Sequence, residues 1–121
     1  MAGSSVPATM RALVLTKAGD DSGAAPTLSF TASRPVPTPP AGHVLVRVHA
    51  SAVHPSDLFN AAGGFVSTTF PRIPGRDFSG VVAAAAADSP QLERLGGAAV
   101  LGTSGATHGF TADGFQADRR R

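Results

Sequence analysis

The sequence predicts an all-β or strand-dominated barrel with one short helix and long loops. The chain has 121 residues, which is enough for one ordinary domain with a real core. Its 14 glycines and 10 prolines are more turn residues than a helical bundle tolerates. Apolar residues make up 42% of the chain and charged residues 15%, a composition typical of a folded domain and not of a disordered one.

Strands are expected where β-branched or alternating apolar residues are followed by a turn signal. The expected ranges are 10–16, 27–31, 43–50, 78–83 and 98–101. In the third range Val44, Val46 and Val48 share one face, because successive side chains of a strand point to opposite sides. The alanine run at 83–87 is compatible with either a helix or a continued strand.

The one helix is expected over 55–60, where Pro55 suits the first helical position and Gly63 stops the element. Residues 34–40 contain four prolines and predict an extended connector, with a PxxP ligand as the alternative.

The two ends of the chain carry separate expectations. Residues 1–9 lack the basic and apolar regions of a signal peptide and are interpreted as a disordered leader, with Met10 as an alternative start. Residues 119–121 are three arginines and are interpreted as a solvated basic tail. A further strand is expected near residue 114, so the domain is interpreted as unfinished at its C-terminal end.

Charge and cysteine content exclude several functions. The net charge is +2, but residues 1–118 hold seven basic and eight acidic side chains, so the body is nearly neutral and predicts no nucleic-acid surface. No apolar run approaches the roughly 18 residues of a membrane span, so no membrane partner is expected. Without cysteine there is no disulfide framework, thiolate zinc site or cysteine nucleophile.

Chemical motifs are sparse. His43 and His49 lie about 20 Å apart on one strand and cannot share a metal, so no metal site is expected. No GxGxxG turn or P-loop is present, so the chain has no recognisable device for holding a dinucleotide pyrophosphate. Polar residues gather in two loops, at 54–57 and 75–77, and by themselves these residues do not define a reaction. Within the first loop Ser56 is also explained as a capping or turn residue.

These loops carry a family resemblance. Segments 10–15, 42–57 and 70–82 resemble the N-terminal, GroES-like domain of the medium-chain dehydrogenase/reductase superfamily. The match is best with the quinone oxidoreductase and enoyl reductase branch and runs from about residue 10 to 118. The resemblance implies a mainly β, GroES-like partial barrel with one or two short helices.

The resemblance also implies a chemistry. His54 and Arg76 occupy the positions where zinc-dependent members carry cysteine and histidine ligands, which implies a zinc-independent enzyme. Such members reduce quinones or activated C=C bonds with NADPH. The resemblance implies that Ser56 lies near the nicotinamide ribose and the substrate, and that His54 forms the wall of the cleft. Both are therefore expected to be catalytic residues. Ser56, His54 and Asp57 are expected to contact the cofactor. Asp77 is expected to fix the loop geometry by pairing with Arg76.

Three departures from the family pattern shape the expectation. The charged pair of the usual Gly-Asp-Arg/Lys-Val turn is replaced by Ala98 and Ala99, the chain ends at residue 121, and the Rossmann domain is absent. We therefore expect a cytoplasmic, truncated and inactive catalytic-side domain. Its full-length form would take a small enone or quinone substrate, and a homodimer is compatible with the family.

Two alternatives remain at this point. One is a non-enzymatic, chaperonin 10-like binding module, in which residues 63–66 form a mobile loop. The other is a non-functional fragment.

Overall fold

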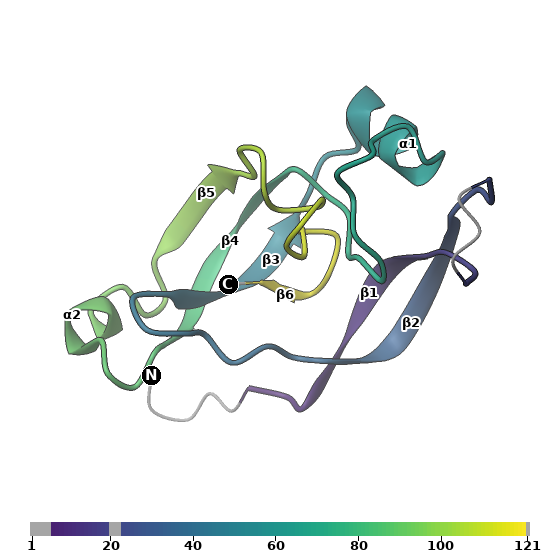
Figure 1. Cartoon of the computed structure of the whole chain (residues 1–121). Helices are drawn as coiled ribbons and strands as arrows, with labels where there is room; N and C mark the ends of the chain where they lie inside the picture. The colour runs from purple at the N-terminus through teal and green to yellow at the C-terminus, as the bar shows by residue number, and fades with distance from the viewer. Residues whose placement is uncertain (1–5, 20–22, 121) are drawn as a thin grey trace.

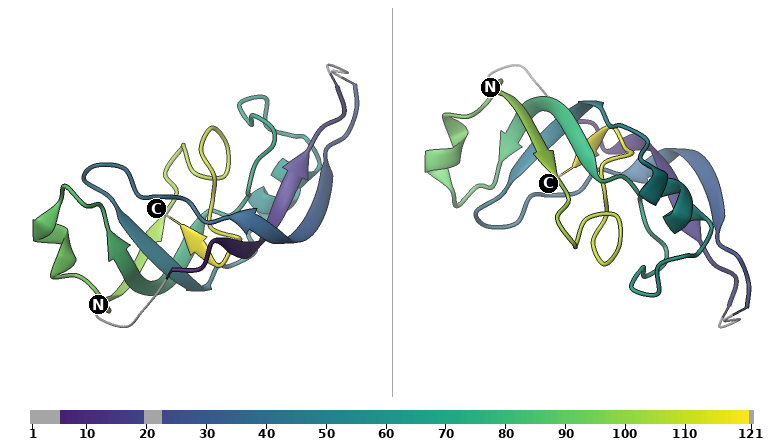
Figure 2. Two further views of the ribbon diagram at one scale, coloured as in Figure 1. Left: turned by 90° about the horizontal axis from the view of Figure 1, so that it is seen from below. Right: turned by 90° about the horizontal axis from the view of Figure 1, so that it is seen from above.

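The computed structural model describes residues 6–19 and 23–120, so much of the expected leader lies outside the described residues. The predicted mainly β architecture is confirmed (Figure 1). The strands are β1 (Thr9–Thr16), β2 (Thr27–Pro35), β3 (Val44–Ala50), β4 (Asp77–Ala85), β5 (Ala99–Thr103) and β6 (Arg119–Arg120). The helices are α1 (Pro55–Ala61) and α2 (Pro90–Glu93), which lie toward opposite ends of the molecule (Figures 1 and 2).

The strands form two sheets. β1 and β2 make an antiparallel hairpin, and a four-stranded antiparallel sheet has the order β5-β4-β3-β6. The segment 116–118 joins the two sheets, because it hydrogen bonds to β1 on one side and to β3 on the other. The Leu13 amide donates to the Gln116 carbonyl (3.0 Å), and the Val48 amide donates to the Asp118 carbonyl (2.7 Å). This segment therefore completes a partial barrel.

The core is built mainly from β1 and β3. Met10, Ala12 and Val14, on alternate positions of β1, are buried together with Ile73, and Leu15 at the end of the strand is fully buried as well. On β3, Leu45 and Val46 point to opposite faces, yet both are almost fully buried. Leu45 lies beside the proline-rich residues 36–39, and Val46 lies beside Phe115 on the other face. Both faces of the sheet are therefore covered at this point.

Three local expectations needed correction or completion. The alanine run continues β4 as far as Ala85 and does not form a helix. The helix α2 was not expected; it begins with Pro90 at its first position. The prediction of a solvated basic tail is wrong for the backbone at 119–120, because Arg119 and Arg120 pair with Arg47 and Val46 of β3. An open strand edge accepts any backbone, so the charge of the two residues did not indicate this pairing.

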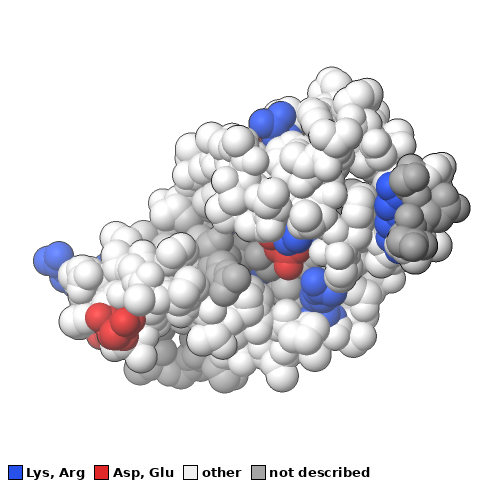
Figure 3. Space-filling model, viewed as in Figure 1, with Lys and Arg blue, Asp and Glu red and all other residues white. Residues whose placement is uncertain are grey.

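The surface carries few charges. The face drawn in Figure 3 is largely uncharged, with a few charged side chains scattered over it and acidic and basic ones side by side near its centre. In the part of the chain that the structure describes, no helix is long and apolar enough to cross a membrane.

Candidate functional site

The first loop is organised by the start of α1. His54 precedes the helix in an extended conformation, and Pro55 occupies the first helical position as predicted. The carboxylate of Asp57 turns back on this helix start, where its Oδ2 accepts a hydrogen bond from the His54 amide at 2.8 Å. The other oxygen, Oδ1, is buried and has no hydrogen-bond partner in the described structure. Asp57 therefore caps the start of the helix with its Oδ2.

The second loop depends on Gly75. Its φ angle of +112° favours glycine, and a Cβ at this position would lie 2.8 Å from the amide nitrogen of Gln116. Gly75 therefore allows the loop to cross directly against the segment that joins the sheets. The Arg76 carbonyl then accepts a hydrogen bond from the Ser104 amide (2.7 Å), which places the Arg76 side chain beside the loop that follows β5.

The two loops meet through His54 and Asp77. The Nε2 of His54 lies 2.7 Å from the Asp77 Oδ2, and the Ala52 amide donates to the other oxygen, Oδ1, at 2.8 Å. The Ala52 amide and then the His54 imidazole lower the pKa of Asp77 below its usual value, because each stabilises the carboxylate. Asp77 is therefore an acceptor, and the imidazole donates to it.

The expected pairing of Asp77 with Arg76 is wrong. Both oxygens of Asp77 already accept hydrogen bonds, one from the Ala52 amide before the first loop and one from His54 within it. The Arg76 guanidinium instead donates from Nη1 to the Ser56 hydroxyl at 3.2 Å and from Nη2 to the Gly105 carbonyl at 3.3 Å. The four predicted residues other than Asp57 thus form two linked pairs, His54–Asp77 and Ser56–Arg76.

Several supporting residues were not predicted. The Asn60 amide donates to the Gly109 carbonyl (2.8 Å), and the Thr68 hydroxyl donates to the Asn60 Oδ1 (2.6 Å). Asn60 is only 2% exposed, so these bonds fasten α1 to the loop after β5. Asn60 lies four residues after Ser56, on the same side of the helix. That spacing is the only sequence signal for Asn60, and it is a weak one.

Aromatic side chains hold the same loops. Phe65 makes edge contacts with Phe59 and Phe110, at centroid distances of 5.0 and 5.1 Å. The guanidinium of Arg76 lies 5.3 Å from the Phe110 ring, over its face. Phe65 therefore packs against both α1 and the loop after β5.

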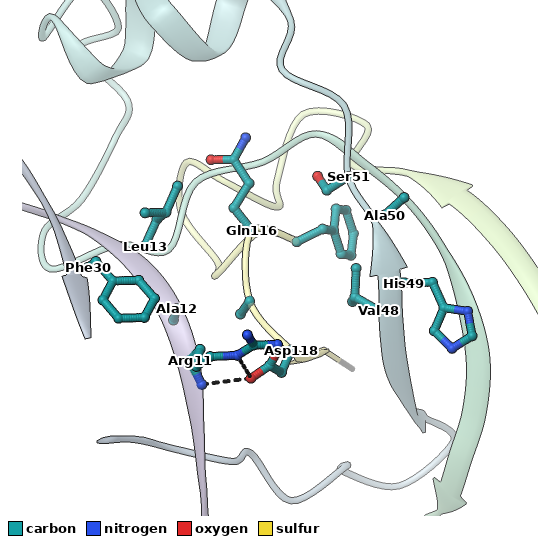
Figure 4. Close-up of a pocket in the computed structure, with 12 residues that line it drawn as sticks. Arg11, Ala12, Leu13, Phe30, Val48, His49, Ala50, Ser51, Gln116 and Asp118 are labelled. Carbon is teal, nitrogen blue, oxygen red and sulfur yellow. Dashed lines mark hydrogen bonds and ion pairs between the residues drawn. The ribbon is translucent and has the colours of Figure 1, made fainter. Parts of the chain in front are cut away.

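The site lies open on the surface. The His54 side chain is 43% exposed, and the neighbouring apolar residues Val53 and Leu58 are 71% and 66% exposed. A groove of about 420 Å³ runs between β1 and β3, with Phe30 on one side and Ser51 on the other (Figure 4). Because Ser51 precedes His54 by three residues, the groove and the first loop share the segment that leads from β3 to α1.

The residues present do not suit a zinc ion. Among the described residues no group of three or more histidine, cysteine, aspartate or glutamate side chains is positioned to hold a metal. The Nε2 of His54 is bonded to Asp77, and the guanidinium of Arg76, a permanent cation, donates to Ser56 two residues after His54.

Known proteins share this domain. Residues 40–113 match the alcohol dehydrogenase GroES-like domain family. A zinc-type alcohol dehydrogenase-like protein of Schizosaccharomyces pombe is 46% identical over 86 residues, which are 71% of this chain and 25% of that protein.

Solved structures agree with the sequence matches. The yhdH oxidoreductase of Salmonella enterica, in complex with NADP, has a TM-score of 0.73 and 33% identity, over 93% of this chain and 32% of that one. A proposed alcohol dehydrogenase of Sinorhizobium meliloti has a TM-score of 0.74 and 26% identity, over 95% of this chain and 38% of that one. The chain thus spans between about a quarter and two fifths of the length of these relatives. By sequence and by fold, it belongs to the alcohol dehydrogenase GroES-like domain family.

Proposed function

We propose that this chain is the substrate-side domain of a zinc-independent oxidoreductase that uses NADPH to reduce quinones or activated C=C bonds. In this proposal Ser56 and His54 line the reacting cleft. The activity requires a nucleotide-binding part that this sequence does not contain, because no glycine turn between a strand and a helix is available for the pyrophosphate.

One observation carries the proposal. Two loops that lie about twenty residues apart in sequence are joined by the His54–Asp77 and Ser56–Arg76 contacts, at 2.7 and 3.2 Å. A hydroxyl, an imidazole oriented by a carboxylate, and a guanidinium therefore converge on one open surface. These groups can bind a polar substrate atom and transfer a proton to it.

The similarity to yhdH supports the choice of cofactor. That oxidoreductase was solved with NADP and shares 33% identity and a TM-score of 0.73 with this chain. In this chain Ser56, His54 and Asp57 are the residues that would meet the nicotinamide end. The cofactor would supply hydride.

The chain's own groups have separate roles in the proposal. The Ser56 hydroxyl hydrogen bonds to the substrate oxygen and orients it. The imidazole of His54 holds or donates the proton that completes the reduction. Asp77 acts through His54 as a positioning residue, because its carboxylate fixes the direction of the imidazole N–H bond.

A chimera tests this function. Residues 1–121 would replace the matching part of yhdH, so that the remainder of yhdH supplies its NADP-binding region. We expect NADPH-dependent reduction of a benzoquinone or an enone, with kcat lowered about 10- to 100-fold by Ser56→Ala and by His54→Ala. Both variants should still bind NADPH as tightly as the unmodified chimera, which serves as the check on assembly.

The matched control for these variants is Ser33→Ala. Ser33 is exposed on β2 and hydrogen bonds with Thr31, far along the chain from both loops, so its substitution should leave the rate unchanged. A chimera that binds NADPH but reduces none of these substrates would contradict the proposed reaction. Unchanged rates in both Ser56→Ala and His54→Ala would contradict the assignment of the site.

A further inference from the structure

The guanidinium of Arg76 has only neutral partners. It donates to the Ser56 hydroxyl at 3.2 Å, to the Gly105 carbonyl at 3.3 Å and to the Ser104 hydroxyl at 3.4 Å. None of the four ion pairs formed by the described residues includes Arg76. The adjacent carboxylate of Asp77 is directed to His54, so the positive charge of Arg76 is not compensated.

The position of this charge increases its effect. Arg76 is half-buried, and its guanidinium rests over the Phe110 ring at 5.3 Å. A charge that is partly removed from water is screened less than a charge on the open surface. The ring and the three acceptors also hold the guanidinium plane in one orientation, so little side-chain entropy is lost when it binds a further group.

Arg76 also keeps donors for a ligand. A guanidinium has five N–H bonds, and the three contacts use three of them. Contacts of 3.2 to 3.4 Å are longer than the usual 2.7 to 2.9 Å of a charged N–H···O⁻ bond. An anionic oxygen would therefore bind Arg76 more strongly than any of its present partners.

We infer that Arg76, together with the Ser56 hydroxyl, binds the substrate oxygen on which negative charge develops during reduction. This inference rests on the proposed function. A reduced nicotinamide, when bound, would supply hydride to the β-carbon of a C=C bond that is conjugated to the substrate carbonyl. The π electrons move onto the carbonyl oxygen, which becomes an enolate or hydroquinone oxyanion and is later protonated. The bound cofactor would be oxidised by the two electrons that the substrate gains.

The substrate class follows from this role. Arg76 favours substrates whose reduction places charge on an oxygen, such as quinones and α,β-unsaturated ketones, because a cation near that oxygen lowers the barrier. Alkenes without a conjugated carbonyl gain nothing from the guanidinium. Cationic substrates are disfavoured by repulsion from Arg76.

Binding of 4-nitrophenolate to the 121-residue chain tests the inference without any cofactor. The phenolate oxygen imitates the oxyanion, and the Nε–H resonance of Arg76 in a labelled sample reports contact directly. We expect a saturable shift of this resonance and a Kd that rises about tenfold or more in Arg76→Met. Arg76→Lys, which keeps the charge but not the planar set of donors, should bind with an intermediate Kd.

The matched control is Arg47→Met. Arg47 is an exposed cation on β3 that belongs to neither loop, so its removal should leave phenolate binding unchanged. The inference is overturned if the Arg76 resonance does not respond in the unmodified chain, or if Arg76→Met binds phenolate as tightly. The first readout needs no variant, so it holds even where a substitution disturbs the loop.

Activity in the chimera separates the inference from the proposed function. Arg76→Met should lower kcat about tenfold or more for a quinone while leaving the Kd for NADPH unchanged. If the chimera binds phenolate at Arg76 but has no reductase activity, the proposed function is refuted, whereas anion binding by Arg76 is supported. Quinone reduction with an unchanged kcat in Arg76→Met would refute the role of Arg76 alone.

Discussion

The imidazole Nε2 of His54 lies 2.7 Å from the carboxylate Oδ2 of Asp77, which joins the start of α1 to the start of β4. Asp77 also accepts a hydrogen bond from the Ala52 amide, so one carboxylate fixes both the backbone before the helix and the first side chain of the loop. This pair is the main connection between the two loops of the site.

Asp77→Asn should change how stability depends on pH. The folded pKa of Asp77 lies below its usual value, so the stabilisation is fully present above the unfolded pKa of about 3.9 and is lost as pH falls through the folded pKa. We expect the variant to be less stable at pH 7 by about 1 kcal/mol. In urea unfolding, this difference should shrink at pH 3 and below. A difference that is the same at pH 7 and pH 2 would exclude a role of the Asp77 charge.

Asn60→Ala should destabilise the chain through the loop that supports the site. The substitution leaves the Gly109 carbonyl and the Thr68 hydroxyl without their bonds to Asn60, and both groups are buried. We expect a loss of about 2–4 kcal/mol in the free energy of unfolding, measured by urea denaturation. Leu58→Ala is the control, because Leu58 lies on the same helix but is 66% exposed. Equal losses in the two variants would contradict the structural role of Asn60.

The purified chain should bind no zinc tightly. The chain contains no cysteine, and Arg76 donates to Ser56 beside His54, where a divalent ion would meet a guanidinium. Elemental analysis after dialysis should find far less than one zinc ion per chain. A stoichiometric, tightly held zinc ion would contradict both this prediction and the zinc-independent function proposed above.

NADPH should bind the 121-residue chain only weakly. The site offers Ser56 and His54 to one end of the cofactor, and the sequence has no glycine turn that could receive the pyrophosphate. One contact region does not offset the entropy lost by a large flexible ligand, so we expect a Kd of about 1 mM or weaker. Titration of NADPH fluorescence measures this value. Micromolar binding would show that the chain holds the cofactor without a further domain.

The chain should associate at high concentration through its exposed apolar strands. β2 and β5 each pair on one side only among the described strands, and Phe30 and Leu101 are 66% and 84% exposed. The double substitution Phe30→Lys and Leu101→Lys should shift the sedimentation profile toward monomer without lowering the melting temperature. A monomeric parent chain at millimolar concentration would contradict this expectation.

The sequence by itself determined the local elements of the chain. β-forming residues predicted β1 and alternation predicted β3, each to within about one residue, and Pro55 marked the start of α1. These signals succeed because side-chain period and proline geometry act over a few neighbouring residues. The same reasoning identified the two polar loops, since they interrupt those local patterns.

Only the tertiary structure decided how the two loops meet. Asp77 bonds to His54 and Arg76 bonds to Ser56, although adjacency in the chain had suggested a pair between Arg76 and Asp77. Likewise, the backbone of Arg119 adds to β3, which no local pattern indicated. Each of these contacts joins segments that lie about twenty or more residues apart. The contacts depend on how the sheets close into the partial barrel, and local sequence preferences carry no information about that closure.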